Sequence, residues 1–218
     1  MSSQGTHILA APPWFVAGDA RNLDHLDAAS VDLIVTSPPY WKRRDYGHEN
    51  QLGQEKTADD YVAALLAALE NWTRVLKPHA SIFLNLGDSY DGGFLIGVPA
   101  LFEVEARKHG WRVLNHIAWT KSIGMPEAKS YRLASRHEPI FQLTRARHAT
   151  DVFMDLFALG QHLQKSANPG DVWVTEPMLA DTVWELHPAR SKSGHLAPFP
   201  PELAERAILL LGTIPKGL

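Results

Sequence analysis

The sequence contains no cysteine among its 218 residues, and this absence excludes several classes of protein. A disulfide framework, a thiolate metal site and a mechanism with a cysteine nucleophile all require thiols. The chain also has no apolar run long enough to span a membrane, and its first residues have neither the basic start nor the apolar core of a signal peptide. We therefore expect a protein of the cytoplasm.

The spacing of glycine and histidine argues against two further kinds of site. No two of the 15 glycines stand in G-x-G spacing, so the chain lacks the glycine-rich turn with which many doubly wound folds approach a nucleotide-like cofactor. The 11 histidines include no His-x-x-x-His pair. We therefore expect no metal site.

The chain has slightly fewer basic than acidic residues, but its basic residues are locally concentrated. The chain carries 21 lysines and arginines against 24 acids, a net charge of −3. Between residues 119 and 147, however, six basic residues stand against two acidic ones, and a second basic run follows Trp41. Basic islands in an acidic chain are typical of contacts with nucleic-acid phosphates, although a solvated loop would have the same composition.

The segments alternate between short β-rich runs and longer helical patterns, which predicts an α/β fold with a parallel sheet. The predicted strands are Val31–Thr36, Ser81–Leu86, Val113–Trp119 and Pro139–Thr144. The predicted helices are Thr57–Leu76, Pro99–Lys108 and Pro201–Leu211. Thr57 is the expected N-cap of the first helix.

The loop after the first predicted strand, Thr36–Trp41, is the strongest candidate for chemistry. It joins a small hydroxyl, two rigid prolines and an aromatic pair, and it lies where an open sheet binds its ligands. Fixed acceptors beside a stacking face suit a planar group with an NH2, such as the exocyclic amine of cytosine or adenine. The alternative is a diproline turn that merely ends the strand.

The run Asp32–Trp41, with the sequence DLIVTSPPYW, resembles the catalytic motif of the amino-group DNA methyltransferases. Further segments resemble the other motifs of this family in a permuted order, with the catalytic motif first and the cofactor motif last. These segments are Ala17–Asp19, Leu76–Pro78, Asn85–Ser89, Trp119–Lys121, Gly124–Pro126, Arg136–Phe141 and His195–Pro200.

The resemblance implies transfer of a methyl group from S-adenosylmethionine to the exocyclic nitrogen of a flipped-out base in double-stranded DNA. Methylation at carbon 5 of cytosine would need the missing cysteine. By resemblance, Ser37 and the carbonyl of Pro38 accept hydrogen bonds from the amine, Pro39 stiffens the loop and Tyr40 stacks on the base. The serine form of the motif leans toward cytosine N4 and the aspartate form toward adenine N6, so we expect cytosine, with adenine as the alternative.

The resemblance also implies the binding residues. Asp19 would contact the cofactor, although it could equally be a helix cap, and the remaining cofactor residues would be Pro198, Phe199 and Pro200. The residues expected to contact DNA are Trp41, Lys42, Arg43, Arg44, Trp119, Lys121, Arg132 and Arg136. We expect one domain over residues 1–218, with 120–136 and 145–195 as candidate DNA-recognition insertions.

In the permuted order, the Phe-x-Gly-x-Gly motif for the cofactor should follow shortly after Lys216–Leu218. We therefore expect a doubly wound, Rossmann-like methyltransferase sheet that is permuted and incomplete at its C-terminus. An incomplete sheet would expose a strand edge and apolar surface. Two alternatives to an independent enzyme follow, namely a half that needs a second chain to supply the cofactor site, and a DNA-binding remnant without catalytic competence.

Overall fold

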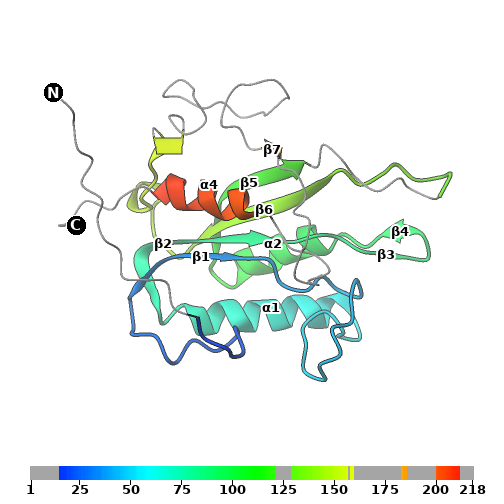
Figure 1. Ribbon diagram of the computed structural model, residues 1–218, viewed down its shortest axis with the longest axis horizontal. Coiled ribbons are helices and arrows are strands. Elements are labelled where there is room, and N and C mark those ends of the chain that lie inside the picture. Colours follow the sequence, from blue (N-terminus) through cyan, green and yellow to red (C-terminus); the bar gives the residue numbers. More distant parts are fainter. Residues whose placement is uncertain (1–14, 121–128, 157, 160–182, 186–199, 212–218) are drawn as a thin grey trace.

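The computed structural model describes residues 15–120, 129–156, 158–159, 183–185 and 200–211. Figure 1 shows their arrangement as a central sheet with helices on both sides. The elements are β1 (Val31–Thr36), α1 (Ala58–Trp72), β2 (Leu76–Asn85), β3 (Tyr90–Asp91), β4 (Phe94–Leu95), α2 (Val98–Lys108), β5 (Arg112–Thr120), β6 (His137–Thr144), a 3-10 turn (Ala149–Asp151), β7 (Val183–Glu185) and α4 (Pro201–Leu211).

The main sheet has five described strands in the order β1-β2-β6-β5-β7. β1 and β2 are parallel, whereas β6 runs antiparallel to both of its neighbours, β2 and β5. The α/β class is confirmed, and the sheet is mixed, because β6 departs from the parallel direction that the alternation of segments predicted. Successive strands run parallel when a crossover element joins them, and the sequence between β5 and β6 has no helical pattern to serve as one.

Helix α1 forms because its apolar residues recur on one stripe and its first turn is capped. The backbone N–H of Asp60 donates to Thr57 Oγ1 at 3.0 Å, which confirms Thr57 as the N-cap. The predicted helix is too long at its C-terminal end, because β2 already begins at Leu76 and runs to Asn85. The buried stripe consists of Tyr61, Val62, Leu65, Leu66, Ala68, Leu69 and Trp72.

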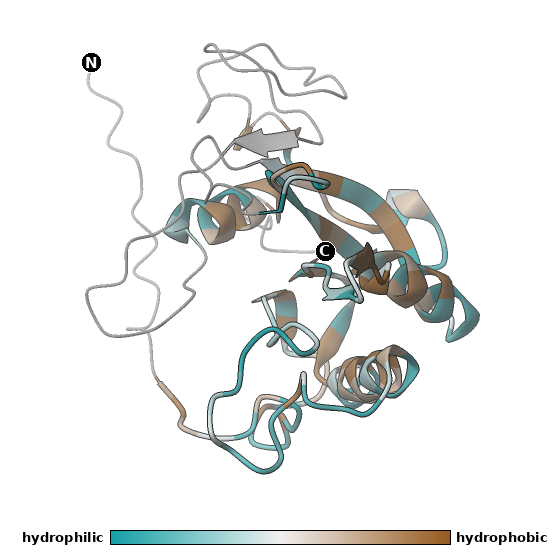
Figure 2. Ribbon diagram, turned by 90° about the vertical axis from the view of Figure 1, so that its right-hand side faces the viewer, coloured by the Kyte–Doolittle hydropathy of each residue, from teal (hydrophilic) through white to brown (hydrophobic). Residues whose placement is uncertain are grey.

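Two hydrophobic clusters lie on the two faces of the sheet. On one face, α1 and α2 pack over β2 and β6 together with Ile34 of β1. On the other face, α4 packs over Leu33 and Val35 of β1 and over Ile117 of β5. In Figure 2 the hydrophobic colour lies mainly on the strands and on parts of the helices, and the hydrophilic colour lies mainly on the connecting loops. The sheet is therefore the middle layer of three.

The remaining predictions agree closely with the described elements. α2 begins at Val98 and ends at Lys108, and α4 has the predicted bounds, Pro201–Leu211. A short hairpin of β3 and β4, which the sequence did not predict, interrupts the connection from β2 to α2. Among the helices that the structure describes, none has the length and apolar character needed to cross a membrane.

Candidate active site at the carboxyl edge of the sheet

Three neighbouring strands bring the candidate residues to one edge of the sheet. β1 ends at Thr36 and the parallel strand β2 ends one residue further on, since Thr36 is in register with Leu84. β6 starts at this edge because it runs the opposite way, with Ile140 opposite Asn85. The loop after β1, the last residue of β2 and the first residues of β6 therefore meet.

Four side chains from these strand ends form a hydrogen-bonded group, which we call the four-residue cluster: Ser37, Tyr40, Asn85 and Glu138. The Ser37 hydroxyl donates to Asn85 Oδ1 at 3.2 Å. The Tyr40 hydroxyl lies 2.5 Å from the same amide oxygen and 2.7 Å from Glu138 Oε2. Because a phenol has a single proton to donate, the two acceptors share it. The hydroxyl end of Tyr40 is thereby fixed from two sides.

The ring of Tyr40 lies directly against the backbone of Gly87. A Cβ built at Gly87 would overlap ring carbons of Tyr40, so any larger residue at this position would displace the ring. Burial raises the pKa of Tyr40 well above its usual value, and the nearby Glu138 carboxylate adds to this rise. The phenol is therefore protonated at any physiological pH, and it acts as a hydrogen-bond donor and an aromatic surface.

The rest of the loop is anchored to the helical layer. The Tyr61 hydroxyl, from the first turn of α1, donates to the carbonyl oxygen of Pro39 at 2.8 Å. Trp41 Nε1 donates to the carbonyl of Glu55 at 3.0 Å, and Ser89 Oγ donates to the carbonyl of Trp41 at 2.5 Å. Proline already fixes φ in the loop, so these bonds hold a backbone with little freedom left.

Comparison with known proteins identifies the family of the chain. A family model described as DNA methylase, covering the N6 and N4 methyltransferases, matches residues 31–218. The chain belongs to this DNA methylase family. As a member it is a DNA amino-methyltransferase with S-adenosylmethionine as its cofactor, which confirms the expectation from the sequence.

Individual relatives agree with the family assignment of this methylase. The type II methyltransferase M.SmaI of Serratia marcescens is 29% identical over 93% of this chain and 76% of its own length. M.XycI of Xanthomonas campestris pv. cyanopsidis is 29% identical over 88% of this chain and 70% of its own length. The solved PvuII DNA methyltransferase, which is cytosine-N4-specific, shares the fold with a TM-score of 0.68 over 90% of this chain and 69% of its own, at 16% identity.

Of the residues expected to hold the cofactor of the methylase, the structure describes Asp19 and Pro200. Asp19 lies near the C-terminal end of α1, where Trp72 donates to the carbonyl of Ala20, whereas the catalytic loop contacts Tyr61 at the helix start. Eleven residues of helix separate these two contacts, roughly 16 Å along the axis. Both carboxylate oxygens of Asp19 already accept from Arg21.

The other residues expected to bind the cofactor are Pro198, Phe199 and Pro200. Pro198 and Phe199 lie outside the described residues, and Pro200 is buried at the start of α4. The role of these residues in holding the cofactor stays a prediction.

The expected DNA contacts divide into buried and exposed residues. Trp41 is only 7% exposed and Trp119 only 4%, so both belong to the hydrophobic clusters, and the expectation that they contact DNA is corrected. The sequence could not show this, because an indole beside a catalytic loop packs inward as readily as outward. Lys42, Arg43, Arg44 and Arg136 are exposed, Arg132 is partly exposed, and Lys121 lies outside the described residues.

Two members of the four-residue cluster, Asn85 and Glu138, had no role predicted from the sequence. Both belong to segments that resemble family motifs, but only the strand register shows that they reach Tyr40. A usable signal was present, since each is a polar residue at the end of a strand that meets the catalytic edge.

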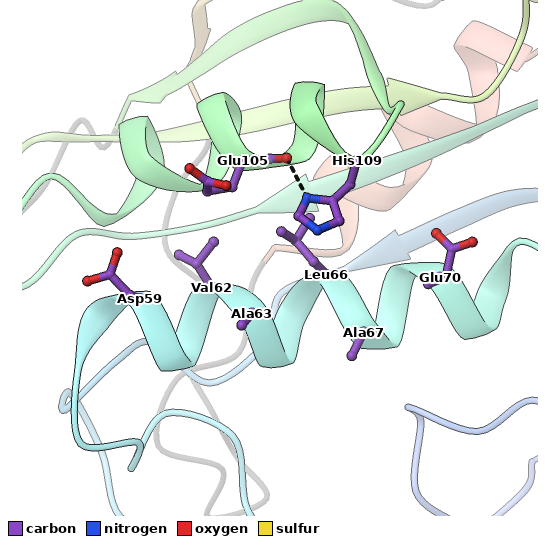
Figure 3. Close-up of a pocket in the computed structure, with 8 residues that line it drawn as sticks. All are labelled: Asp59, Val62, Ala63, Leu66, Ala67, Glu70, Glu105 and His109. Carbon is purple, nitrogen blue, oxygen red and sulfur yellow. Dashed lines mark hydrogen bonds between the residues drawn. The ribbon is translucent and has the colours of Figure 1, made fainter.

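A groove of about 530 Å³ on the outer surface of the methylase lies away from this cluster. Figure 3 shows it between α1 and α2, with the ring of His109 turned toward the backbone oxygen of Glu105, which lies 2.9 Å from Nδ1. Its other lining residues are Asp59, Val62, Ala63, Leu66, Ala67 and Glu70. No member of the four-residue cluster lines this groove, so it is not the site of the chemistry suggested by the loop.

Proposed function

We propose that this methylase transfers a methyl group to the exocyclic N4 of cytosine in double-stranded DNA, with adenine N6 as the alternative target. The observation that carries the proposal is the position of Ser37. Its hydroxyl donates to Asn85 Oδ1 at 3.2 Å or to the Tyr40 hydroxyl at 3.5 Å, and in either arrangement the lone pairs of its oxygen are left to accept from an amine.

The carbonyl of Pro38 is the second proposed acceptor. The next carbonyl along the loop, that of Pro39, is occupied by the Tyr61 hydroxyl. Within the described part of the chain, no hydrogen bond ends on the carbonyl of Pro38. Two acceptors on the two hydrogens of the amine would direct the nitrogen lone pair out of the base plane, toward the methyl group that S-adenosylmethionine supplies. Catalysis would then depend on positioning and on preorganised dipoles.

Tyr40 is the proposed stacking surface for the flipped base. Its ring is backed by Gly87, its hydroxyl is held by Asn85 and Glu138, and part of the side chain is still accessible. A ring fixed in this way needs no reordering when the base arrives. Glu138 is therefore proposed as a positioning residue that acts through Tyr40.

The experiment is incubation of unmethylated genomic DNA with the protein and labelled S-adenosylmethionine, followed by digestion and identification of the methylated nucleoside. We expect N4-methyldeoxycytidine. N6-methyldeoxyadenosine would overturn the choice of base, and 5-methyldeoxycytidine would overturn the whole mechanism. Ser37→Ala should abolish the product, whereas Ser30→Ala, whose hydroxyl bonds only to the carbonyl of Asp27 just before β1, is the matched control.

A second candidate function is a half-enzyme that acts together with a second chain. β1 is the outermost strand at one edge of the described sheet, and Ile208 of α4 is exposed. These features support an additional surface for a partner. Calorimetric titration with S-adenosylmethionine, with and without DNA, separates the candidates: saturable binding to the chain alone favours the independent enzyme, and the absence of binding with DNA affinity intact favours the half-enzyme.

A further inference from the structure

Large apolar side chains are exposed at the end of the molecule that carries the catalytic loop. Phe94 in β4 is 80% exposed, and Tyr131 and Leu133 in the segment before β6 are 69% and 91% exposed. Leu95 is also exposed. We call these four residues the hairpin patch. Exposed apolar surface of this kind typically marks an interaction site.

The two parts of the hairpin patch are held together. The guanidinium of Arg132 lies 4.0 Å from the ring centre of Tyr90, and a Cβ at Gly93 would come within 3.1 Å of the Tyr131 hydroxyl. Figure 1 shows the β3–β4 hairpin and the approach to β6 projecting from the same end of the molecule. Gly92 and Gly93 have φ of +53° and +91°, as a tight two-residue turn requires. The hairpin that carries Phe94 therefore packs against the segment before β6.

The hairpin is also braced against the catalytic loop. Ser89, at its base, donates to the carbonyl of Trp41 and accepts from the backbone N–H of Ile96 at 3.0 Å. The carboxylate of Asp88 accepts from the backbone of Gly97 and Val98, where α2 begins. These hydrogen bonds attach the base of the hairpin to the loop that carries Ser37 and Tyr40.

We propose that the hairpin patch enters the DNA duplex and that Phe94 is the wedge that fills the space left by the flipped base. This inference rests on the proposed function, because an enzyme that modifies a base must first remove it from the stack. Apolar side chains inserted between base steps stabilise such openings.

The charges around the patch favour DNA over a protein partner. Lys129, Arg132 and Arg136 lie on the same segment before β6 as Tyr131 and Leu133. The acid at the hairpin tip, Asp91, stands opposite Phe94. The cations of the neighbouring segment would meet the DNA backbone while Phe94 meets bases.

The test compares equilibrium binding of the full chain to a short duplex with one abasic site and to the same duplex intact. Because binding needs no turnover, its result is independent of whether methylation is observed. We expect the wild-type protein to prefer the abasic duplex and Phe94→Ala to lose that preference, by roughly 10-fold from typical stacking contributions. Phe94→Leu, which keeps an apolar wedge, should retain part of it.

Three controls make the result specific. Val104→Ala, at an apolar residue of α2 that is 51% exposed, should bind like the wild type. The slope of log affinity against log salt should be unchanged in Phe94→Ala, but should fall by about one in Arg136→Ala, at an exposed arginine of the segment before β6. Equal losses of Phe94→Ala on both duplexes, or none on either, would overturn the wedge. Capture of a protein partner that depends on Phe94, with DNA binding intact, would overturn DNA as the occupant.

Discussion

Replacement of Gly87 by alanine is the sharpest test of the site geometry, because it adds one methyl group where the Tyr40 ring already lies. The φ of Gly87 is outside the left-handed region, so the backbone itself accepts alanine and only the steric overlap matters. If the ring stays, an overpacked contact costs about 1–3 kcal/mol. If the ring moves, it breaks its hydroxyl bonds to Asn85 and Glu138, which are worth about 1 and about 1.5–3 kcal/mol.

The variant adopts whichever arrangement costs less free energy, either the overpacked contact or the displaced ring. We therefore expect Gly87→Ala to lower the free energy of unfolding by about 1–3 kcal/mol. Methylation should fall by roughly 10- to 100-fold, because either route moves the proposed stacking surface. Urea unfolding and initial rates of methyl transfer measure the two quantities. Gly18→Ala is the control, since a Cβ at Gly18 meets no atom within 4 Å.

Removal of the ring provides a second check on the same reasoning. In the background of Tyr40→Ala, the additional change Gly87→Ala should cost almost nothing, because the overlap has gone. The reasoning is refuted if Gly87→Ala behaves like Gly18→Ala in both assays, or if the losses of the two changes simply add.

The other predictions concern the supports of the loop and one surface ion pair. Glu138→Gln should keep most of the methylation activity, whereas Glu138→Ala should lose roughly 10-fold. In the Tyr40→Phe background, which lacks the hydroxyl, the change Glu138→Ala should cause no further loss of methylation rate, and a double-mutant cycle tests this. Tyr61→Phe should lower stability by about 1 kcal/mol in urea and reduce kcat more than DNA affinity, because it releases the second proline carbonyl of the loop. The hydrogen bonds from Arg21 lower the pKa of Asp19 from 3.8 to about 2, so their stabilisation is present above about pH 4 and lost as the pH falls toward 2. Between about pH 2 and pH 4, the free energy of unfolding of Asp19→Asn should depend less on pH than that of the wild type. Near neutral pH the free energy of unfolding should hardly change, because the Asp19–Arg21 pair is exposed.

Local sequence determined most of the secondary structure and the family of this protein. Helix α1 follows from a periodic apolar stripe and a threonine cap, and β1 follows from a β-branched run that two prolines end. The Thr36–Trp41 loop was identifiable because rigid prolines, a hydroxyl and aromatic rings in adjacent positions are informative without any partner. The family match over residues 31–218 confirmed what these short-range patterns indicated.

Only the tertiary structure decided which residues meet. The antiparallel direction of β6 brings Glu138 to the ring of Tyr40 across 98 positions of sequence, and nothing in the local pattern of either segment reports that register. The inward packing of Trp41, the distance of Asp19 from the loop and the bracing of the hairpin also depend on contacts between distant segments. Periodicity and capping act over a few residues, whereas a site is assembled by strand order and packing, which the sequence specifies only through the whole fold.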